Sequence, residues 1–168
     1  CQEMVKTAFL DDDLNKVYNL TSANSINVAR WLPQSFYFFF AYQQLLQKGF
    51  DKDLVFSVPS GNFGNICAGI VAKQLGLPVH HFVASTNSND TVPRYLRTQK
   101  YSPLPSKQTI SNAMDVGNPS NFIRIQNLFD NDFDALKQQF SSYAFNDDET
   151  RLALKALHEK YNYIADPH

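Results

Sequence analysis

The chain has 168 residues and a formal net charge of −1, with 15 Lys and Arg against 16 Asp and Glu. This length predicts one globular domain, and a near-neutral chain without a basic stripe is not expected to bind nucleic acid. No apolar run approaches the roughly 18 residues of a membrane-spanning helix, and no signal peptide is recognisable, so we expect a cytoplasmic protein without a membrane partner. Cys1 and Cys67 form neither a disulfide framework nor a metal-binding spacing, and no metal is expected.

The first 50 residues are expected to contribute a short strand and a long aromatic helix. Residues 1–9 have the apolar spacing of a helix end, and Lys16–Leu20 is interpreted as a strand that follows a charged turn. Thr21–Asn27 is rich in residue types that cap helices. A helix over residues 27–48 should then be buried on nearly all sides because it is strongly aromatic, with a kink where Pro33 removes a hydrogen bond.

The most informative stretch of the sequence comes next. Leu54–Val58 is a short apolar run typical of a buried parallel strand, and Pro59 ends it. Ser60–Asn65 is a loop of small and turn-forming residues with the sequence Ser-Gly-Asn-Phe-Gly-Asn. Apolar positions then recur at helical spacing from Ile66 to a C-cap at Gly76.

A strand, a turn and a helix in this order form half of a βαβ unit, and the turn is a natural anion site. Its backbone N–H groups lie at the positive end of the helix dipole. Gly61 and Gly64 can adopt positive φ, which lets a phosphate approach the backbone. The loop lacks the glycine pattern of dinucleotide-binding proteins and the closing Lys-Ser or Lys-Thr of P-loop NTPases. On pattern alone, an ordinary βα turn without a ligand remains the alternative.

A second strand and a second polar loop follow, Val79–Ala84 and Ser85–Asp90. Further helices are predicted over residues 92–98, 121–128, 132–140 and 147–161. Three strands alternating with helices predict an α/β fold, in which helices flank a parallel sheet. The polar loops Thr21–Asn27, Ser60–Asn65 and Ser85–Asp90 would then meet at the carboxyl edge of the sheet and suit a small phosphorylated ligand. Ordinary helix capping is the alternative for each loop.

The other chemically active side chains give little indication of a metal-binding or catalytic site. His80 and His81 are adjacent in a predicted strand, so they face opposite sides and cannot share a metal ion. Arg30 lies about one turn from the first polar loop and could bind an anion there, or could be an ordinary surface arginine. We find no nucleophile paired with a base, so no catalytic residue is assigned within the chain.

Four motifs together resemble threonine synthase, a pyridoxal 5′-phosphate (PLP) enzyme family of fold type II. They are Asn-Ser-Ile-Asn with Arg three residues on (24–30), the loop at 60–65, Ser-Thr-Asn-Ser-Asn-Asp-Thr-Val-Pro-Arg (85–94) and Ser-Asn-Ala-Met-Asp-Val-Gly-Asn-Pro-Ser-Asn-Phe (111–122). The motifs follow the family's order along nearly the whole chain. The resemblance implies a lyase of threonine biosynthesis that converts O-phosphohomoserine and water into L-threonine and phosphate.

The resemblance also implies a role for individual residues. It assigns the phosphate of PLP to Ser60, Gly61, Asn62, Phe63, Gly64 and Asn65, and the substrate to Asn24, Ser25, Asn27 and Arg30. Asn89, Asp90 and Arg94 are motif residues to which we assign no contact. The resemblance further implies a PLP-binding α/β core over residues 1–110 and an additional helical C-terminal region over residues 111–168 of the same enzyme.

The chain departs from the family pattern at one essential point. The family's Schiff-base lysine lies in a Phe-Lys-Asp context upstream of these motifs, and none of the ten lysines has that context. We therefore expect an internal piece of the enzyme, inactive alone, whose partner is the remainder of the same polypeptide. Two alternatives remain: a threonine-synthase-like phospholyase that acts on another O-phosphorylated amino alcohol, and a non-catalytic phosphate-binding module.

Overall fold

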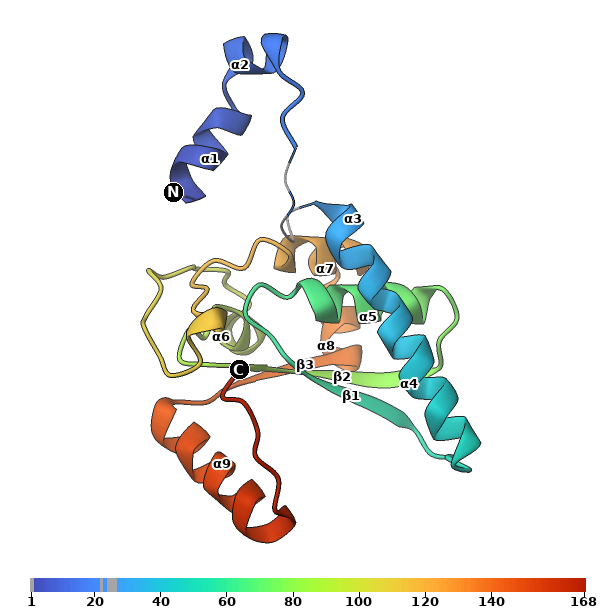
Figure 1. Cartoon of the computed structure of the whole chain (residues 1–168). Helices are drawn as coiled ribbons and strands as arrows, with labels where there is room; N and C mark the ends of the chain where they lie inside the picture. The colour runs from blue at the N-terminus through green and yellow to red at the C-terminus, as the bar shows by residue number, and fades with distance from the viewer. Residues whose placement is uncertain (1, 22, 24–26) are drawn as a thin grey trace.

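A computed structural model of the chain describes residues 2–21, 23 and 27–168. A parallel sheet with strand order β1-β2-β3 lies at its centre (Figure 1). β1 spans Leu54–Pro59, β2 spans Val79–Thr86 and β3 spans Phe140–Ala144. Val58 of β1 is paired with Ala84 of β2, and both pairings in the sheet are parallel. The α/β class and the parallel pairing of the first two strands are therefore confirmed.

The third strand is not the one predicted. Residues 16–20 form no strand, because α2 spans Asp12–Val17 and an extended segment follows it. Asp11 caps this helix by accepting hydrogen bonds from the backbone N–H groups of Asp13 and Leu14, both at 3.0 Å. The capping aspartate outweighs the β-favouring side chains that suggested a strand. The actual third strand is β3, which begins at the last residue of the helix predicted over 132–140 and continues through residues to which no element was assigned.

The remaining helices agree closely with the predicted segments. They are α1 (Gln2–Phe9), α3 (Val28–Trp31), α4 (Ser35–Gln47), α5 (Gly64–Gln74), α6 (Thr91–Thr98), α7 (Phe122–Leu128), α8 (Phe133–Gln139) and α9 (Asp147–Tyr161). Two 3₁₀ turns complete the set, η1 (Leu32–Gln34) and η2 (Asn112–Met114). η1 contains Pro33 and separates α3 from α4, so the predicted interruption near that proline is confirmed.

The aromatic helix α4 is less buried than its composition suggested. Phe38 is buried and packs edge-on against Phe56 of β1, with ring centroids 4.9 Å apart. Phe36, Tyr37 and Phe40 are instead 60%, 68% and 61% exposed. The expectation of burial on nearly all sides is wrong, because α4 contacts the sheet and α5 through one face only.

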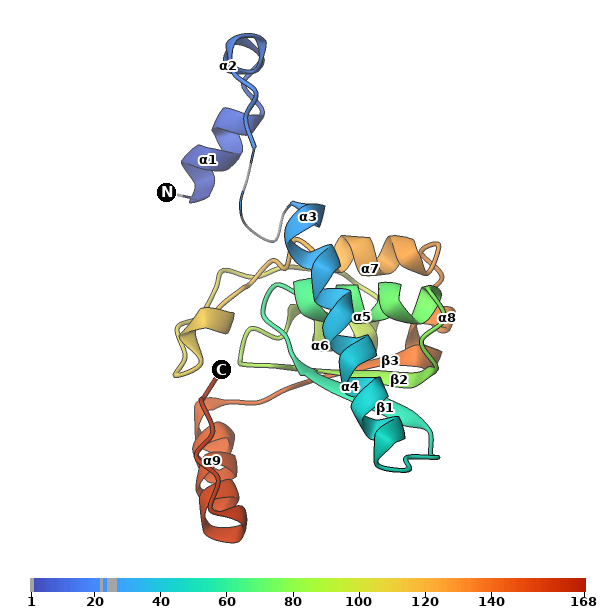
Figure 2. The ribbon, with the colours of Figure 1, turned by 45° about the vertical axis from the view of Figure 1, so that its right-hand side comes forward.

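The core lies between the sheet and α5. Ile66, Ile70 and the helix's small residues are buried, and Gly69 lies against Phe82 of β2, while α4 and α7 pack on α5. Both views show α1 with α2, and separately α9, standing away from this layered body (Figures 1 and 2). No helix of the described part of the chain is long and apolar enough to cross a membrane. The boundary placed at residue 110 remains a prediction, although β3, which lies beyond it, completes the sheet.

Candidate functional site

The loop Ser60–Asn65 connects β1 to α5 at the carboxyl edge of the sheet. The backbone N–H of Ser60 donates to the carbonyl oxygen of Ser85 at 2.8 Å, which extends the β1–β2 ladder by one bond. The buried hydroxyl of Ser60 donates to the carbonyl oxygen of Val58 at 3.0 Å. These bonds fix the start of the loop, and α5 begins at Gly64, two residues before the helical spacing of apolar residues starts at Ile66.

The first turn of α5 presents unsatisfied backbone donors. The N–H groups of Gly64, Asn65 and Ile66 form no hydrogen bond to any residue that the structure describes, whereas the next one, on Cys67, donates to the carbonyl oxygen of Phe63 at 3.1 Å. No side chain caps the helix. Because such orphan N–H groups sit at the positive end of the helix dipole, this turn can bind an anion.

The backbone conformation of the loop differs from the prediction. The positive φ angle occurs at Phe63, with φ 61°, and neither Gly61 nor Gly64 is among the glycines with positive φ. Gly61 is required for a different reason: a Cβ there would lie 2.8 Å from the Cα of Met114. Its role is close packing against another loop, and the left-handed residue is a buried phenylalanine.

The two asparagine side chains of the loop contact other segments of the chain. Asn62 accepts two hydrogen bonds through Oδ1, from the backbone N–H of Ser120 at 2.7 Å and from the Ser120 hydroxyl at 3.0 Å. Asn65 donates through Nδ2 to the side-chain oxygen of Gln34 at 2.9 Å. The loop is therefore anchored to η1 and to the turn before α7.

The predicted substrate residues are only partly placed. Asn24 and Ser25 lie outside the described residues. Asn27 caps α3, since its Oδ1 accepts from the N–H of Ala29 at 3.0 Å. Arg30 is exposed at the end of α3, and its carbonyl oxygen accepts from Gln34 at 3.2 Å. Because α3 and η1 both contact α5, the structure brings this segment beside the anion-binding turn although no strand precedes it.

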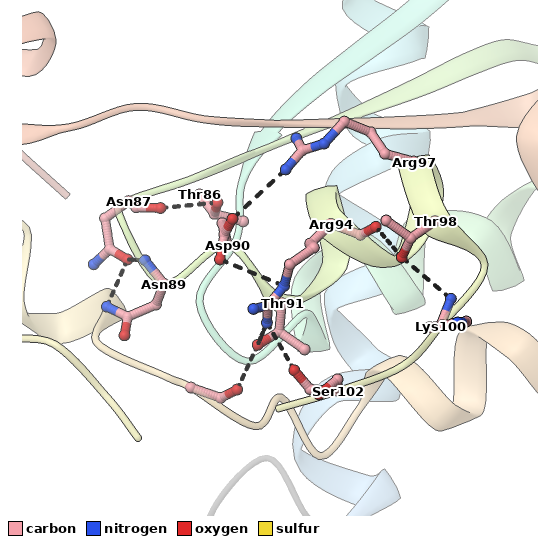
Figure 3. Close-up of polar contacts among 11 residues, drawn as sticks. Thr86, Asn87, Asn89, Asp90, Thr91, Arg94, Arg97, Thr98, Lys100 and Ser102 are labelled. Carbon is pink, nitrogen blue, oxygen red and sulfur yellow. Dashed lines mark hydrogen bonds and ion pairs between the residues drawn. The ribbon is translucent and has the colours of Figure 1, made fainter. Parts of the chain in front are cut away.

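The second polar loop, Ser85–Asp90, is a structural junction. Asn87 donates to the carboxylate of Asp115 at 2.8 Å and to the hydroxyl of Thr109 at 3.0 Å. Asn89 donates to the carbonyl oxygen of Lys107 at 3.0 Å and accepts from the N–H of that residue at 2.7 Å. Both asparagines are buried, and Figure 3 shows them turned toward one another. The residue types that suggested a ligand site here bind the segment 107–115.

Asp90 and Arg94 have contacts of the same kind. Arg94 donates to the carbonyl oxygen of Ser102 at 2.7 Å, and its Nε lies 3.9 Å from the Asp90 carboxylate (Figure 3). Arg97 lies 3.7 Å from the other oxygen of Asp90. Asp90 and Arg94 thus stabilise α6 and the segment that follows it. We assign no ligand contact to either residue.

The sequence alone indicated no role for several residues near the loop. Asn121 is completely buried, its Oδ1 accepts from Arg124, and its Nδ2 has no hydrogen-bond partner in the described part of the chain. The Arg124 guanidinium lies 5.8 Å from the centroid of the Trp31 ring. Ser120 and Asn121 belong to the motif at 111–122, but nothing in the sequence shows that Ser120 contacts a loop almost 60 residues away.

Titratable groups near α5 are structural. Burial raises the pKa of the Cys67 thiol to about 12, while the nearby Arg124 guanidinium opposes this shift. Burial also lowers the pKa of Lys73 and raises that of Tyr101. Among the described residues, no group of three His, Cys, Asp or Glu side chains could hold a metal ion.

Comparisons with known proteins identify what the chain is similar to, although no family model matches it. Threonine synthase of Haemophilus influenzae is 48% identical over 169 residues, and that of Escherichia coli 47% over 168 residues. The Schizosaccharomyces pombe enzyme is 33% identical over 213 residues. Each match covers 100% of this chain but only 39–41% of the relative, so the chain spans about two fifths of the length of these proteins.

Solved structures of threonine synthases are likewise similar to this chain over its whole length. The crystal structure of Escherichia coli threonine synthase superposes with a TM-score of 0.89 at 45% identity, and covers 100% of this chain and 39% of that one. PLP-bound threonine synthase from Brucella melitensis gives 0.87 at 33% identity, with 100% and 41% covered. Maize serine racemase, at 15% identity and a TM-score of 0.57, shares the fold alone. The resemblance found in the four sequence motifs is confirmed.

Proposed function

We propose that this chain, which is homologous over its whole length to threonine synthases, forms the phosphate-binding part of a PLP site in an enzyme that makes L-threonine and phosphate from O-phosphohomoserine and water. The observation that carries the proposal is the first turn of α5, whose N–H groups have no acceptor among the described residues. The homology extends through the loop that precedes this turn.

The loop fits the phosphate of PLP by its chemistry. Three backbone donors of α5 and the helix dipole favour a dianion, and no Asp or Glu lies within the loop to repel it. The anchored side chains of Asn62 and Asn65 hold the backbone in place before the ligand arrives. PLP, when bound, supplies an electron sink for a carbanion beside the substrate's amino group. The residues of this chain bind and orient the phosphate end of the cofactor.

The substrate side of the site includes the segment before α3. We assign Asn24, Ser25, Asn27 and Arg30 to O-phosphohomoserine, supported by the contact of α3 with α5 and by the exposed guanidinium of Arg30. The cationic side chain of Arg30, on a helix that contacts α5, is suited to bind a second phosphate. The reacting lysine and the remaining pocket walls are assigned to the rest of the same polypeptide. A cytoplasmic location remains a prediction from the sequence.

The proposal is tested by assaying the full-length protein for phosphate release and threonine formation. O-phosphohomoserine should support turnover, and another O-phosphorylated amino alcohol should not. The variant Asn62→Asp keeps a side-chain acceptor for Ser120 but places a carboxylate in the loop, so it should weaken PLP binding at least tenfold. Phosphate release from the second substrate alone would identify a different phospholyase. Undiminished PLP binding by Asn62→Asp would show that the loop is a structural turn.

A further inference from the structure

Besides its anchor on η1, the phosphate-binding loop is contacted at three successive residues by one distant segment, residues 114–122. Gly61 faces Met114, since a Cβ on Gly61 would lie 2.8 Å from the Met114 Cα. Asn62 accepts both hydrogen bonds from Ser120. Phe63, the next loop residue, packs its ring edge-on against the ring of Phe122 in the same segment. The contacts are consecutive along the loop, so the segment acts on its whole central part.

The contact at Phe63 explains how the loop keeps an unfavourable backbone conformation. A non-glycine residue in the left-handed region costs free energy that the surrounding structure must offset. Phe63 is buried and meets Phe122 with ring centroids 5.7 Å apart and planes at 71°. Phe122 is itself completely buried. The aromatic contact therefore holds the residue immediately before the free N–H groups of α5.

The contact at Asn62 determines which way its carboxamide points. A backbone N–H can only donate, so the atom of Asn62 that faces the Ser120 N–H at 2.7 Å must be the oxygen. The Ser120 hydroxyl donates to the same oxygen at 3.0 Å. A carboxamide rotated by 180° would place an NH₂ group against the N–H of Ser120. Ser120 thus fixes both the rotamer of Asn62 and the orientation of its amide.

We propose that Ser120 is a positioning residue for the cofactor phosphate, acting through Asn62 to preorganise the loop so that the α5 N–H groups are directed at the anion. This inference rests on the proposed function, because it takes the loop to be the PLP phosphate site. Ser120 need not touch the cofactor. Preorganisation lowers the cost of ordering the loop upon binding, so its loss appears in affinity.

The test measures the dissociation constant of PLP and the ³¹P chemical shift of its bound phosphate in variants of the full-length protein. Ser120→Ala keeps the backbone bond and loses the hydroxyl bond, so it should bind PLP about three- to tenfold more weakly, with a shifted ³¹P resonance. Ser120→Thr retains a hydroxyl and should restore both values. Ser102→Ala, an exposed serine whose carbonyl oxygen serves Arg94, is the matched control and should match wild type in both.

A double-mutant cycle separates positioning through Asn62 from a general loss of structure. In an Asn62→Ala background the hydroxyl of Ser120 has lost its acceptor, so Ser120→Ala should change PLP affinity less than about twofold. Wild-type affinity in Ser120→Ala, or an equal loss in both backgrounds, would overturn the inference while leaving the phosphate site intact. Undiminished PLP binding by Asn62→Asp would instead overturn the proposed site, and this inference with it.

Discussion

Asp115 is the residue through which two loops of the site region are joined. Its carboxylate accepts from Asn87 Nδ2 at 2.8 Å, from the Thr109 hydroxyl at 2.8 Å and from the Thr109 N–H at 3.1 Å. Asn89 adds a longer bond at 3.3 Å. All of these groups donate, so an anion with four lone-pair directions suits the position better than any neutral side chain.

Replacing Asp115 with Asn should therefore destabilise the protein. The amide would turn an NH₂ group toward donors, and the loss of charge-assisted bonds should cost about 2 kcal/mol of unfolding free energy. Urea denaturation measures this cost. Asp53→Asn, at an exposed position before β1, is the control and should change stability by less than about 0.5 kcal/mol. A neutral effect of Asp115→Asn would show that the network contributes order but no net stability.

Individual site residues were only partly predictable from the sequence. The Asn-rich loops Ser60–Asn65 and Ser85–Asp90 look equivalent as sequences, yet the second uses Asn87 and Asn89 to bind its own chain. The difference arises from partners 18 to 28 residues away, such as Lys107 and Asp115. Local composition identifies residues that can cap, turn or bind an anion, but it does not specify which of these they do.

At the scale of elements, α5 approaches both α4 and the sheet closely because Gly69 has no side chain. A Cβ on Gly69 would lie 2.6 Å from two ring atoms of Phe38 and 2.9 Å from one of Phe82. In a free helix, alanine is more favourable than glycine by about 1 kcal/mol. In this helix, overpacking should exceed that gain, because both rings are buried in the core.

We expect Gly69→Ala to lower the free energy of unfolding by about 1–2 kcal/mol, despite its better helix propensity. Urea denaturation measures the change in the free energy of unfolding, and its sign shows whether overpacking or helix propensity dominates. A stabilised Gly69→Ala protein would mean that the two phenylalanine rings move aside at little cost. The close approach of α5 to the sheet would then have some other cause.

The burial of Cys67 within α5 gives a pH-dependent prediction. With a pKa near 12, about 1 in 10⁴ Cys67 thiols is ionised at pH 8, so a thiol reagent should react only after unfolding. Because the folded-state pKa lies above the ordinary value of 9.0, the folded state holds its proton while the unfolded thiol ionises. This contribution to stability is complete below pH 9 and is lost as pH rises from about 9 toward 12.

Reaction with a chromogenic disulfide in a Cys1→Ser background measures the accessibility of Cys67. The native protein should react at least a hundredfold more slowly than the same protein in denaturant. A native rate equal to that of a free cysteine would contradict the burial of α5. Denaturation midpoints at pH 8 and pH 10 test the linkage separately, and the midpoint should fall at the higher pH.

The elements that sequence analysis predicted correctly carry local signals. α9 begins at a capping box in which Asn146 and Glu149 exchange hydrogen bonds of 2.8 and 2.9 Å, and its start at Asp147 follows from adjacent residues. β3 has no comparable signal, since it continues directly from α8 and is fixed by pairing Phe140 with Phe82. Strand partners distant in sequence, unlike helix caps, are not visible in a local pattern.

For the molecule as a whole, the fold class followed from strands alternating with helices and the family from the order of the motifs, while the shape of the site followed from neither. The four motifs lie within 99 residues, from Asn24 to Phe122. Their order along the chain is specific to the family. The contact of residues 114–122 with the loop is a tertiary contact, which a local sequence pattern does not reveal. The relatives from Haemophilus influenzae and Escherichia coli are about two and a half times as long as this chain.

The last prediction concerns the 168-residue chain studied alone with PLP. Several charge-assisted hydrogen bonds to the phosphate should contribute roughly 1.5–3 kcal/mol each. Lost translational and rotational freedom opposes them by about 4 kcal/mol or more. The chain covers only 39% of the length of the Haemophilus influenzae relative, and none of the ten lysines has the family's Phe-Lys-Asp context. We therefore expect reversible binding with a Kd of about 10⁻⁴ M or weaker, and no threonine formation.

Titration of the purified chain with PLP, followed by absorbance, measures this affinity. Inorganic phosphate should compete, because the contacts are made to the phosphate group. Asn62→Asp should abolish the binding, since a carboxylate would then face the dianion. A stoichiometric adduct that borohydride traps on one lysine would refute the prediction, because a lysine of this chain would then anchor the cofactor covalently. Mass mapping of the trapped lysine would identify the covalent site directly.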